Sequence, residues 1–174
     1  MGQAMTEREI EAVLREVTDE EVAFYQEYGW VMMKQLVAPE FASEFLRLGQ
    51  EWNLKQQDRE RRRNSTAGLA IEGVEPFRSF MLSERMAQNA TRLVDRKRLK
   101  DVDVPLRYRT DIVILKSPGA ASGTYHQDSS EHGSDRVGEL QFWLALAEVT
   151  PEMGAMRFVS RSHREGPLGA VFND

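Results

Sequence analysis

The chain contains no cysteine among its 174 residues, and this absence excludes several kinds of chemistry. Without thiols there is no cysteine nucleophile, no disulfide and no zinc site built on cysteine. A chain without cysteine agrees with a reducing compartment, where disulfides are rare. The length and the 41% hydrophobic content are sufficient for one globular domain with its own core. We therefore expect a cytoplasmic globular protein.

Long apolar runs and an excess of basic residues are also missing. A membrane-spanning helix needs about 20 consecutive apolar residues, and the chain has no such run. The first residues lack the apolar stretch of a signal peptide. The net charge of −5 makes the chain a poor candidate for binding nucleic acid or an anionic membrane surface. We expect a small-molecule substrate as the partner, with no nucleic acid and no membrane, and the oligomeric state stays open.

Apolar residues at helical spacing predict helices in the first third of the chain. One covers residues 6–16, and a second begins after Thr18, which forms a capping box with Glu21. Gly29 is suited to the left-handed position that ends this second helix. A third helix begins near Pro39, since proline is favoured in a first helical turn.

The next stretch alternates between less regular and helical patterns. Residues 55–66 are strongly polar and predict a solvated helix end or loop, although three consecutive arginines within them could also meet a phosphate. Residues 68–76 predict a mobile loop. Ser83 is a candidate N-cap for a helix that runs to about Arg98. Between the second and third helices, residues 30–33 predict a strand.

From residue 106 onward the hydrophobic period changes to two, which is typical of strands. Strands are predicted at 107–115, at 139–148 and at 155–159. In the second of these, leucines and a phenylalanine occupy one face while Gln141 and Trp143 occupy the other. Helices followed by short, closely spaced strands favour an α+β fold with a sandwich or jelly roll.

The segment Thr124-Tyr-His-Gln-Asp128 carries the candidate chemistry. In an extended backbone His126 and Asp128 point to the same side and Gln127 points to the other. An imidazole beside a carboxylate supplies two of the three ligands in the 2-His-1-carboxylate triad of non-haem Fe(II) sites. Many such triplets are plain surface loops, so this motif is weak when taken alone.

The order of motifs raises the specificity. His-Gln-Asp is followed by Leu-Gln-Phe-Trp-Leu-Ala-Leu-Ala over residues 140–147, by an acidic turn with Gly154, and by Ser-Arg-Ser-His-Arg over residues 160–164. This order resembles the phytanoyl-CoA dioxygenase-like family of Fe(II)/2-oxoglutarate oxygenases. The resemblance covers roughly residues 18 to 170. The family reads Pro-Gly-Ser-His-Arg in the last motif, so the chain departs from it at two positions.

The resemblance implies an architecture and a reaction. N-terminal helices would pack on a double-stranded β-helix, the cupin-like form of the jelly roll. His126 and Asp128 would be iron ligands and catalytic residues, with Fe(II) as cofactor and 2-oxoglutarate as cosubstrate. The 2-oxo acid would be decarboxylated to succinate while a substrate C–H bond is oxidised. Related halogenases lack a carboxylate at the Asp128 position, so its presence predicts hydroxylation or another oxidation rather than halogenation.

Further residues are assigned with less specificity. Trp143 matches the strand tryptophan beside the 2-oxoglutarate site, although packing inside a sandwich is an equally good reading. Gln141 shares its face, and Lys116 or Arg78 would help to hold a carboxylate, so we name Trp143, Gln141 and Lys116 as cofactor-binding candidates. Thr124 and Tyr125 flank the site and would shape the pocket. His163 is expected to be structural rather than a metal ligand, and His132 is expected in solvent or facing substrate.

One departure concerns the end of the chain. In the family, a second iron histidine and an arginine that pairs with 2-oxoglutarate lie beyond the position that corresponds to residue 174. We expect residues 1–174 to be a single oxygenase-like domain that is truncated at its C-terminal end, with part of the barrel absent. A piece of a longer protein is the favoured explanation; a fragment completed by a partner and a non-catalytic relative are the alternatives.

The functional hypothesis is a non-haem Fe(II)/2-oxoglutarate-dependent dioxygenase acting on a small organic substrate of natural-product or lipid-like kind. Two alternatives stay open. One is a non-catalytic binding or scaffold protein on the same fold, and the other is a cupin-like metalloenzyme of different chemistry, since two ligands do not identify the metal or the cosubstrate.

Overall fold

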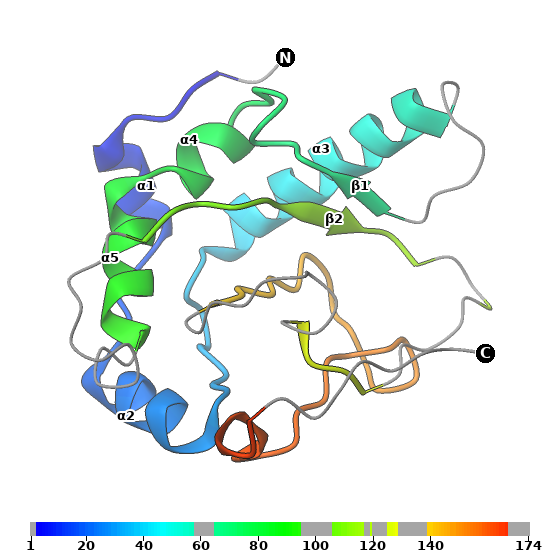
Figure 1. Ribbon diagram of the computed structural model, residues 1–174. Helices are drawn as coiled ribbons and strands as arrows, with labels where there is room; N and C mark the ends of the chain where they lie inside the picture. The colour runs from blue at the N-terminus through cyan, green and yellow to red at the C-terminus, as the bar shows by residue number, and fades with distance from the viewer. Residues whose placement is uncertain are drawn as a thin grey trace.

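A computed structural model describes residues 3–57, 65–94, 106–116, 119, 125–128 and 139–166. Figure 1 shows the helices α1, α2, α4 and α5 gathered on one side, with the strands and the later segments passing across the other. The elements, in chain order, are α1 (Glu7–Val13), α2 (Asp19–Tyr28), α3 (Pro39–Gln57), β1 (Ser65–Ala67), α4 (Phe77–Met81), α5 (Glu84–Leu93), β2 (Ile112–Ile114) and the 3₁₀-helix η1 (Ser162–Arg164).

The first two helices begin at capping boxes. At the start of α2, the Glu21 amide donates to the Thr18 hydroxyl at 3.2 Å, and the Thr18 amide donates to the Glu21 carboxylate at 2.9 Å. Thr6 and Glu9 repeat the arrangement at α1. Gly29 ends α2 in the left-handed region, with φ of 80°. Each box satisfies amides that a helix end leaves without partners, so the prediction of the second helix, its cap and its end is confirmed.

The core lies between the helices and beneath the strands. Phe41 and Phe45 of α3 pack against Phe77 and Phe80 of α4, with ring centroids 4.1 to 5.1 Å apart. The short helix α4 was not predicted. The segment that leads into α4 is also packed against the core, because Leu69 is fully buried. The loop predicted over 68–76 is confirmed as a series of turns, and its beginning is packed into the core.

The two strands pair with each other and rest on α3. β1 and β2 are antiparallel, with Thr66 opposite Val113. Gly49 lets β2 approach α3 closely: a Cβ there would lie 2.9 Å from Val113 Cγ1. The strand predicted over 107–115 is confirmed only at 112–114, and the strand predicted over 30–33 is wrong.

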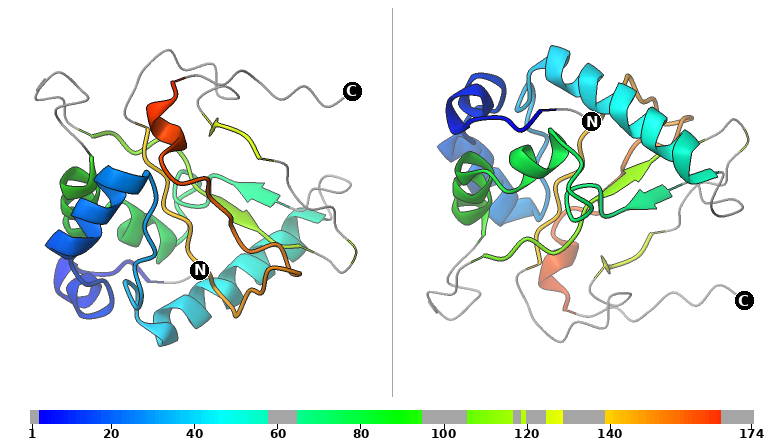
Figure 2. Two further views of the ribbon diagram at one scale, coloured as in Figure 1. Left: turned by 90° about the horizontal axis from the view of Figure 1, so that it is seen from below. Right: turned by 90° about the horizontal axis from the view of Figure 1, so that it is seen from above.

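The segment 139–148 keeps the predicted alternation without forming a strand ladder within the described residues. Its leucines and Phe142 are half-buried and pack against the core, whereas Gln141 and Trp143 are exposed. Figure 2 shows this segment and the one after it crossing the molecule as extended chain. Since the described residues contain one two-stranded sheet, the jelly roll stays a prediction.

Among the described residues, no helix has both the length and the apolar character needed to cross a membrane.

Helix α5 begins at the predicted cap, where the Met86 amide donates to the Ser83 hydroxyl at 3.2 Å, and it ends at Leu93. The predicted continuation to Arg98 and the arginines at 61–63 lie outside the described residues.

Candidate metal centre

His126 and Asp128 lie together on the segment 125–128. His126 Nε2 is 3.1 Å from Asp128 Oδ1, and both side chains are partly open to solvent, at 38% and 41%. Gln127 between them points elsewhere, because its amide nitrogen donates to the carbonyl of Gly166 at 3.0 Å. The structure thus brings the predicted pair to the same side of the chain.

The distance between these two atoms fits a shared metal ion as well as a direct hydrogen bond. Two donor atoms that are each ~2.1 Å from one ion, at right angles to each other, are ~3 Å apart. Imidazole and carboxylate are also the donor types that suit Fe(II). Among the described residues, no cluster of three or more His, Cys, Asp or Glu is placed to hold a metal. The pair therefore fits two ligand positions of such a site.

The residue next to this pair contacts the segment 155–159. Tyr125 is 57% exposed, and the guanidinium carbon of Arg157 lies 5.5 Å from the centre of its ring. The sequence did not single out Arg157, and its only signal was the alternation of the predicted strand. Thr124, which is expected to shape the pocket, and His132, which is expected in solvent or facing substrate, lie outside the described residues.

The candidate cofactor-binding residues lie on surfaces of different segments. Trp143 is 46% exposed, so it does not pack inside a sandwich among the described residues. Gln141 shares its exposed face. Lys116 lies against the turn that ends at Gly154, where a Cβ would come within 2.7 Å of the lysine nitrogen. Arg78 donates to the carbonyl of Ala70 at 3.1 Å and so ties down the turn before α4.

The Ser-Arg-Ser-His-Arg turn is attached to the end of α2. His163 lies against Gly29, where a Cβ would be 2.3 Å from its Nδ1, and its Nε2 is 3.4 Å from the carbonyl of Gln26. This position agrees with the structural role expected for His163. In Figure 1 the turn is the red coil beside α2.

Both departures from the family motif make contacts with α2 and its end. Ser160 accepts a hydrogen bond from the indole of Trp30 at 3.0 Å. Arg161 has φ of 68°, in the left-handed region, and pairs with Glu27 at 2.7 Å while lying over the ring of Tyr28. Hydrogen bonds from Arg164 and Arg161 lower the pKa of Glu27. Sequence reasoning missed Glu27, because nothing in the pattern of α2 relates it to a turn more than 130 residues away.

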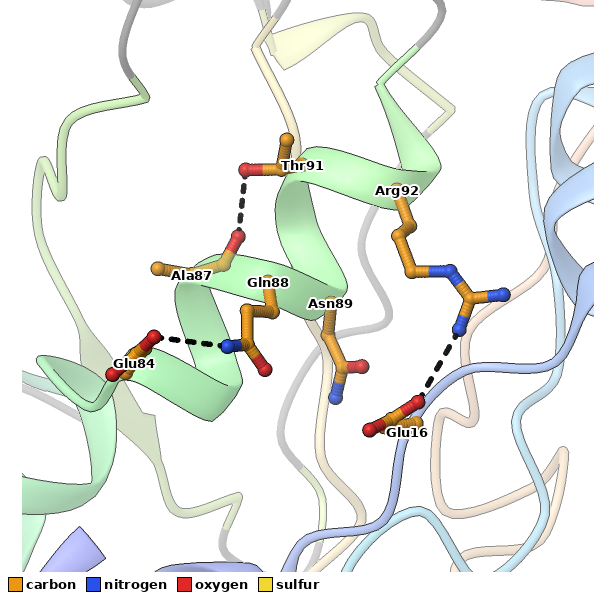
Figure 3. A pocket seen from close by; sticks show the side chains of 7 residues that line it. All are labelled: Glu16, Glu84, Ala87, Gln88, Asn89, Thr91 and Arg92. Carbon is orange, nitrogen blue, oxygen red and sulfur yellow. Dashed lines mark hydrogen bonds and ion pairs between the residues drawn. The ribbon is translucent and has the colours of Figure 1, made fainter.

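A groove beside α5 lies apart from the candidate metal ligands and has a different character. Figure 3 shows its lining, where Gln88 points to Glu84 and Arg92 points to Glu16. Asn89 at its base is fully buried and satisfied: its oxygen accepts from the Val17 amide and its nitrogen donates to the Arg15 carbonyl, each at 2.9 Å. The polar groups of Asn89 therefore hold α5 against the chain between α1 and α2.

An imidazole–carboxylate pair that follows a helical N-terminal half supplies two of the three ligands expected of a non-haem iron oxygenase. Residues 25–172 match the sequence model of the family described as Phytanoyl-CoA dioxygenase (PhyH), and the chain belongs to this family. The family consists of Fe(II)/2-oxoglutarate-dependent oxygenases, which makes an oxygenase-type activity the general function. Neither a curated protein nor a solved structure matches the chain significantly.

Proposed function

We propose that the chain carries the first two iron ligands of an Fe(II)/2-oxoglutarate-dependent dioxygenase that oxidises a small organic substrate, natural-product or lipid-like in kind. The observation that supports this proposal is the 3.1 Å approach of His126 Nε2 to Asp128 Oδ1 within a member of the family. A jelly roll that surrounds His126 and Asp128 is part of the same proposal.

The residues have distinct tasks in this proposal. His126, in its neutral form, and the Asp128 carboxylate would hold Fe(II), which supplies the activation of dioxygen together with the 2-oxo acid. Trp143, Gln141 and Lys116 would contact the 2-oxo acid, and the first two have an exposed face available for this. Because Asp128 would contribute a carboxylate ligand, the expected outcome is hydroxylation or a related oxidation rather than halogenation.

The test is the formation of succinate from 2-oxoglutarate in the presence of Fe(II), measured on the full-length protein. His126→Ala and Asp128→Ala are each expected to abolish turnover and to weaken Fe(II) binding. His132→Ala, an equal change at a histidine that we do not expect to bind metal, is the matched control for Fe(II) binding. If the full-length protein neither binds Fe(II) nor forms succinate, the proposal is wrong.

A second candidate is a non-catalytic binding protein, and it is favoured by the two-donor site. Two ligands hold iron weakly, and the described residues offer no third. Under this alternative His126→Ala leaves ligand binding unchanged, whereas the dioxygenase requires a loss of metal affinity. A metalloenzyme of other chemistry would instead show metal-dependent activity that does not require 2-oxoglutarate.

A further inference from the structure

The neighbours of the candidate iron ligands attach the segment 125–128 to a later part of the chain. Tyr125 contacts Arg157, whose guanidinium carbon lies 5.5 Å from the centre of the tyrosine ring. Two residues further on, the side-chain amide of Gln127 donates to the Gly166 carbonyl at 3.0 Å. Alternate residues of extended chain share a side, so these contacts hold the side of the segment that is opposite to its two candidate ligands.

The turn that precedes Gly166 is itself fixed on the C-terminal end of α2. Glu27 pairs with Arg161 at 2.7 Å and with Arg164 at 2.6 Å, and we call these three residues the clasp. The Arg161 amide also donates to the Tyr28 carbonyl at 2.8 Å. A helix C-terminus leaves carbonyls without partners and favours nearby cations, and α2 has no basic residue in its own last turn. The turn therefore supplies the end of α2 with both a hydrogen-bond donor and positive charge.

One residue of the clasp takes a strained backbone conformation. Arg161 has φ of 68°, which glycine adopts freely and other residues do not. The family motif has glycine at this position, so the strain in this chain is offset only by what the arginine side chain contacts. Those contacts are the ion pair with Glu27 and the ring of Tyr28.

Helix α2 gives the clasp a fixed attachment. Val22 and Tyr25 pack against the hydrophobic core, and the Asp19 carboxylate at the start of the helix accepts a hydrogen bond from Arg92 of α5 at 2.6 Å. The connection thus runs from the core through α2 and the clasp to η1, and from there to the segment that carries the candidate ligands.

We propose that Gln127 and the clasp are positioning residues for the candidate metal centre. Glu27 fixes η1 on α2, and Gln127 passes this constraint to the backbone between His126 and Asp128. Ligands that are already held in place lose less conformational freedom when they bind, so the site binds metal more tightly. The effect on iron rests on the dioxygenase function proposed above, whereas the coupling of α2 to this segment does not.

The first measurement is hydrogen–deuterium exchange of the metal-free, full-length protein, read by mass spectrometry on peptides that cover residues 125–128. Glu27→Gln removes the negative charge of the clasp, and Gln127→Met removes the hydrogen bond at nearly constant size. Each is expected to raise the exchange rate of this segment about threefold or more, which is the size of one hydrogen bond. Glu44→Gln is the matched control, because Glu44 pairs with Arg47 of α3 at 2.6 Å and its side chain is 42% exposed, against 43% for Glu27. It is expected to leave the segment unchanged.

Fe(II) binding by the same variants shows whether the coupling reaches the ligands. Anaerobic titration is expected to give binding about threefold weaker in Glu27→Gln and in Gln127→Met, and parental binding in Glu44→Gln. The double variant of Glu27 and Gln127 is expected to lose less than the product of the two single effects, because both act on one connection. Two independent effects on stability would multiply instead.

The results separate the positioning role from the catalytic proposal. Exchange of residues 125–128 that Glu27→Gln leaves unchanged would overturn the positioning role even if succinate is formed. Fe(II) affinities that are equal in the parent and both variants, or losses that multiply in the double variant, would overturn it as well. A parent that binds no Fe(II) would instead overturn the dioxygenase function, and faster exchange in both variants would still support the coupling of α2 to this segment.

Discussion

The two halves of the molecule bury their apolar residues to different extents. Among the described residues, every buried hydrophobic side chain but one precedes residue 94, and the exception is Val113. Both parts of the chain expose some large apolar groups, but in the later segments these groups are exposed without a comparable buried set, and they include Ile112, Ile114, Trp143, Met153, Met156, Phe158 and Val159. Helices satisfy their own backbone groups, whereas extended chain needs neighbouring strands to do so. The candidate metal centre lies in the later half, whose extended segments need neighbouring strands to satisfy their backbone groups.

Truncating one phenylalanine in each half tests this contrast most strongly. Phe80 is fully buried against Phe41 and Phe45, so Phe80→Ala is expected to lower the free energy of unfolding by about 3–5 kcal/mol. Phe158 is 53% exposed and stacks on Trp30, and its truncation is expected to cost less than about 1 kcal/mol. Urea denaturation of both variants measures the difference. Equal losses would show that the core of the later half contributes as much to the free energy of unfolding as that of the first half.

The buried amide of Asn89 gives the next largest effect. It joins α5 to the chain between α1 and α2 through the Val17 amide and the Arg15 carbonyl. Asn89→Ala leaves both groups without their partner, so we expect a loss of about 2 kcal/mol in the same denaturation experiment. Gln88→Ala, on the exposed side of the same helix, is the control and is expected to change stability by less than about 0.5 kcal/mol. Similar losses in the two variants would refute a special role for Asn89.

The left-handed backbone of Arg161 allows a sharper test of how the halves are joined. Arg161→Ala removes the ion pair and the contact with Tyr28 while keeping the backbone strain of a non-glycine residue. Arg161→Gly removes the same contacts and relieves that strain. We expect the glycine variant to be the more stable by about 1 kcal/mol in thermal unfolding. If alanine proves equal or better, the left-handed conformation does not hold in solution.

The smallest expected effect is a dependence on pH at Glu27. Arg164 and Arg161 lower its pKa in the folded state, so the group stabilises the fold above its unfolded pKa of about 4.3. This stabilisation is lost as the pH falls through the lower, folded pKa. The unfolding temperature of the parent should therefore exceed that of Glu27→Gln at pH 7, and the difference should shrink in acid. A constant difference from pH 7 down to strongly acidic pH would contradict the assignment.

Local signals predicted the parts of the fold that depend on neighbours in sequence. Thr18 with Glu21, the left-handed Gly29 and the Ser83 cap all have the roles that their residue types and spacing indicated. Prediction failed where distant contacts decide. Leu69 is buried within a segment predicted to be mobile, since its partners lie on other helices. Residues 30–33 have the composition of a strand, but within the described part of the chain no strand pairs with them.

For the candidate site, the sequence by itself determined which chemical groups are available and that His126 and Asp128 share a side, because alternation along extended chain is a local property. Only the tertiary structure placed Arg157 over Tyr125 and attached the 160–164 turn to Glu27. These contacts join residues that are far apart in the chain. They depend on how whole segments pack, which spacing within one segment does not specify.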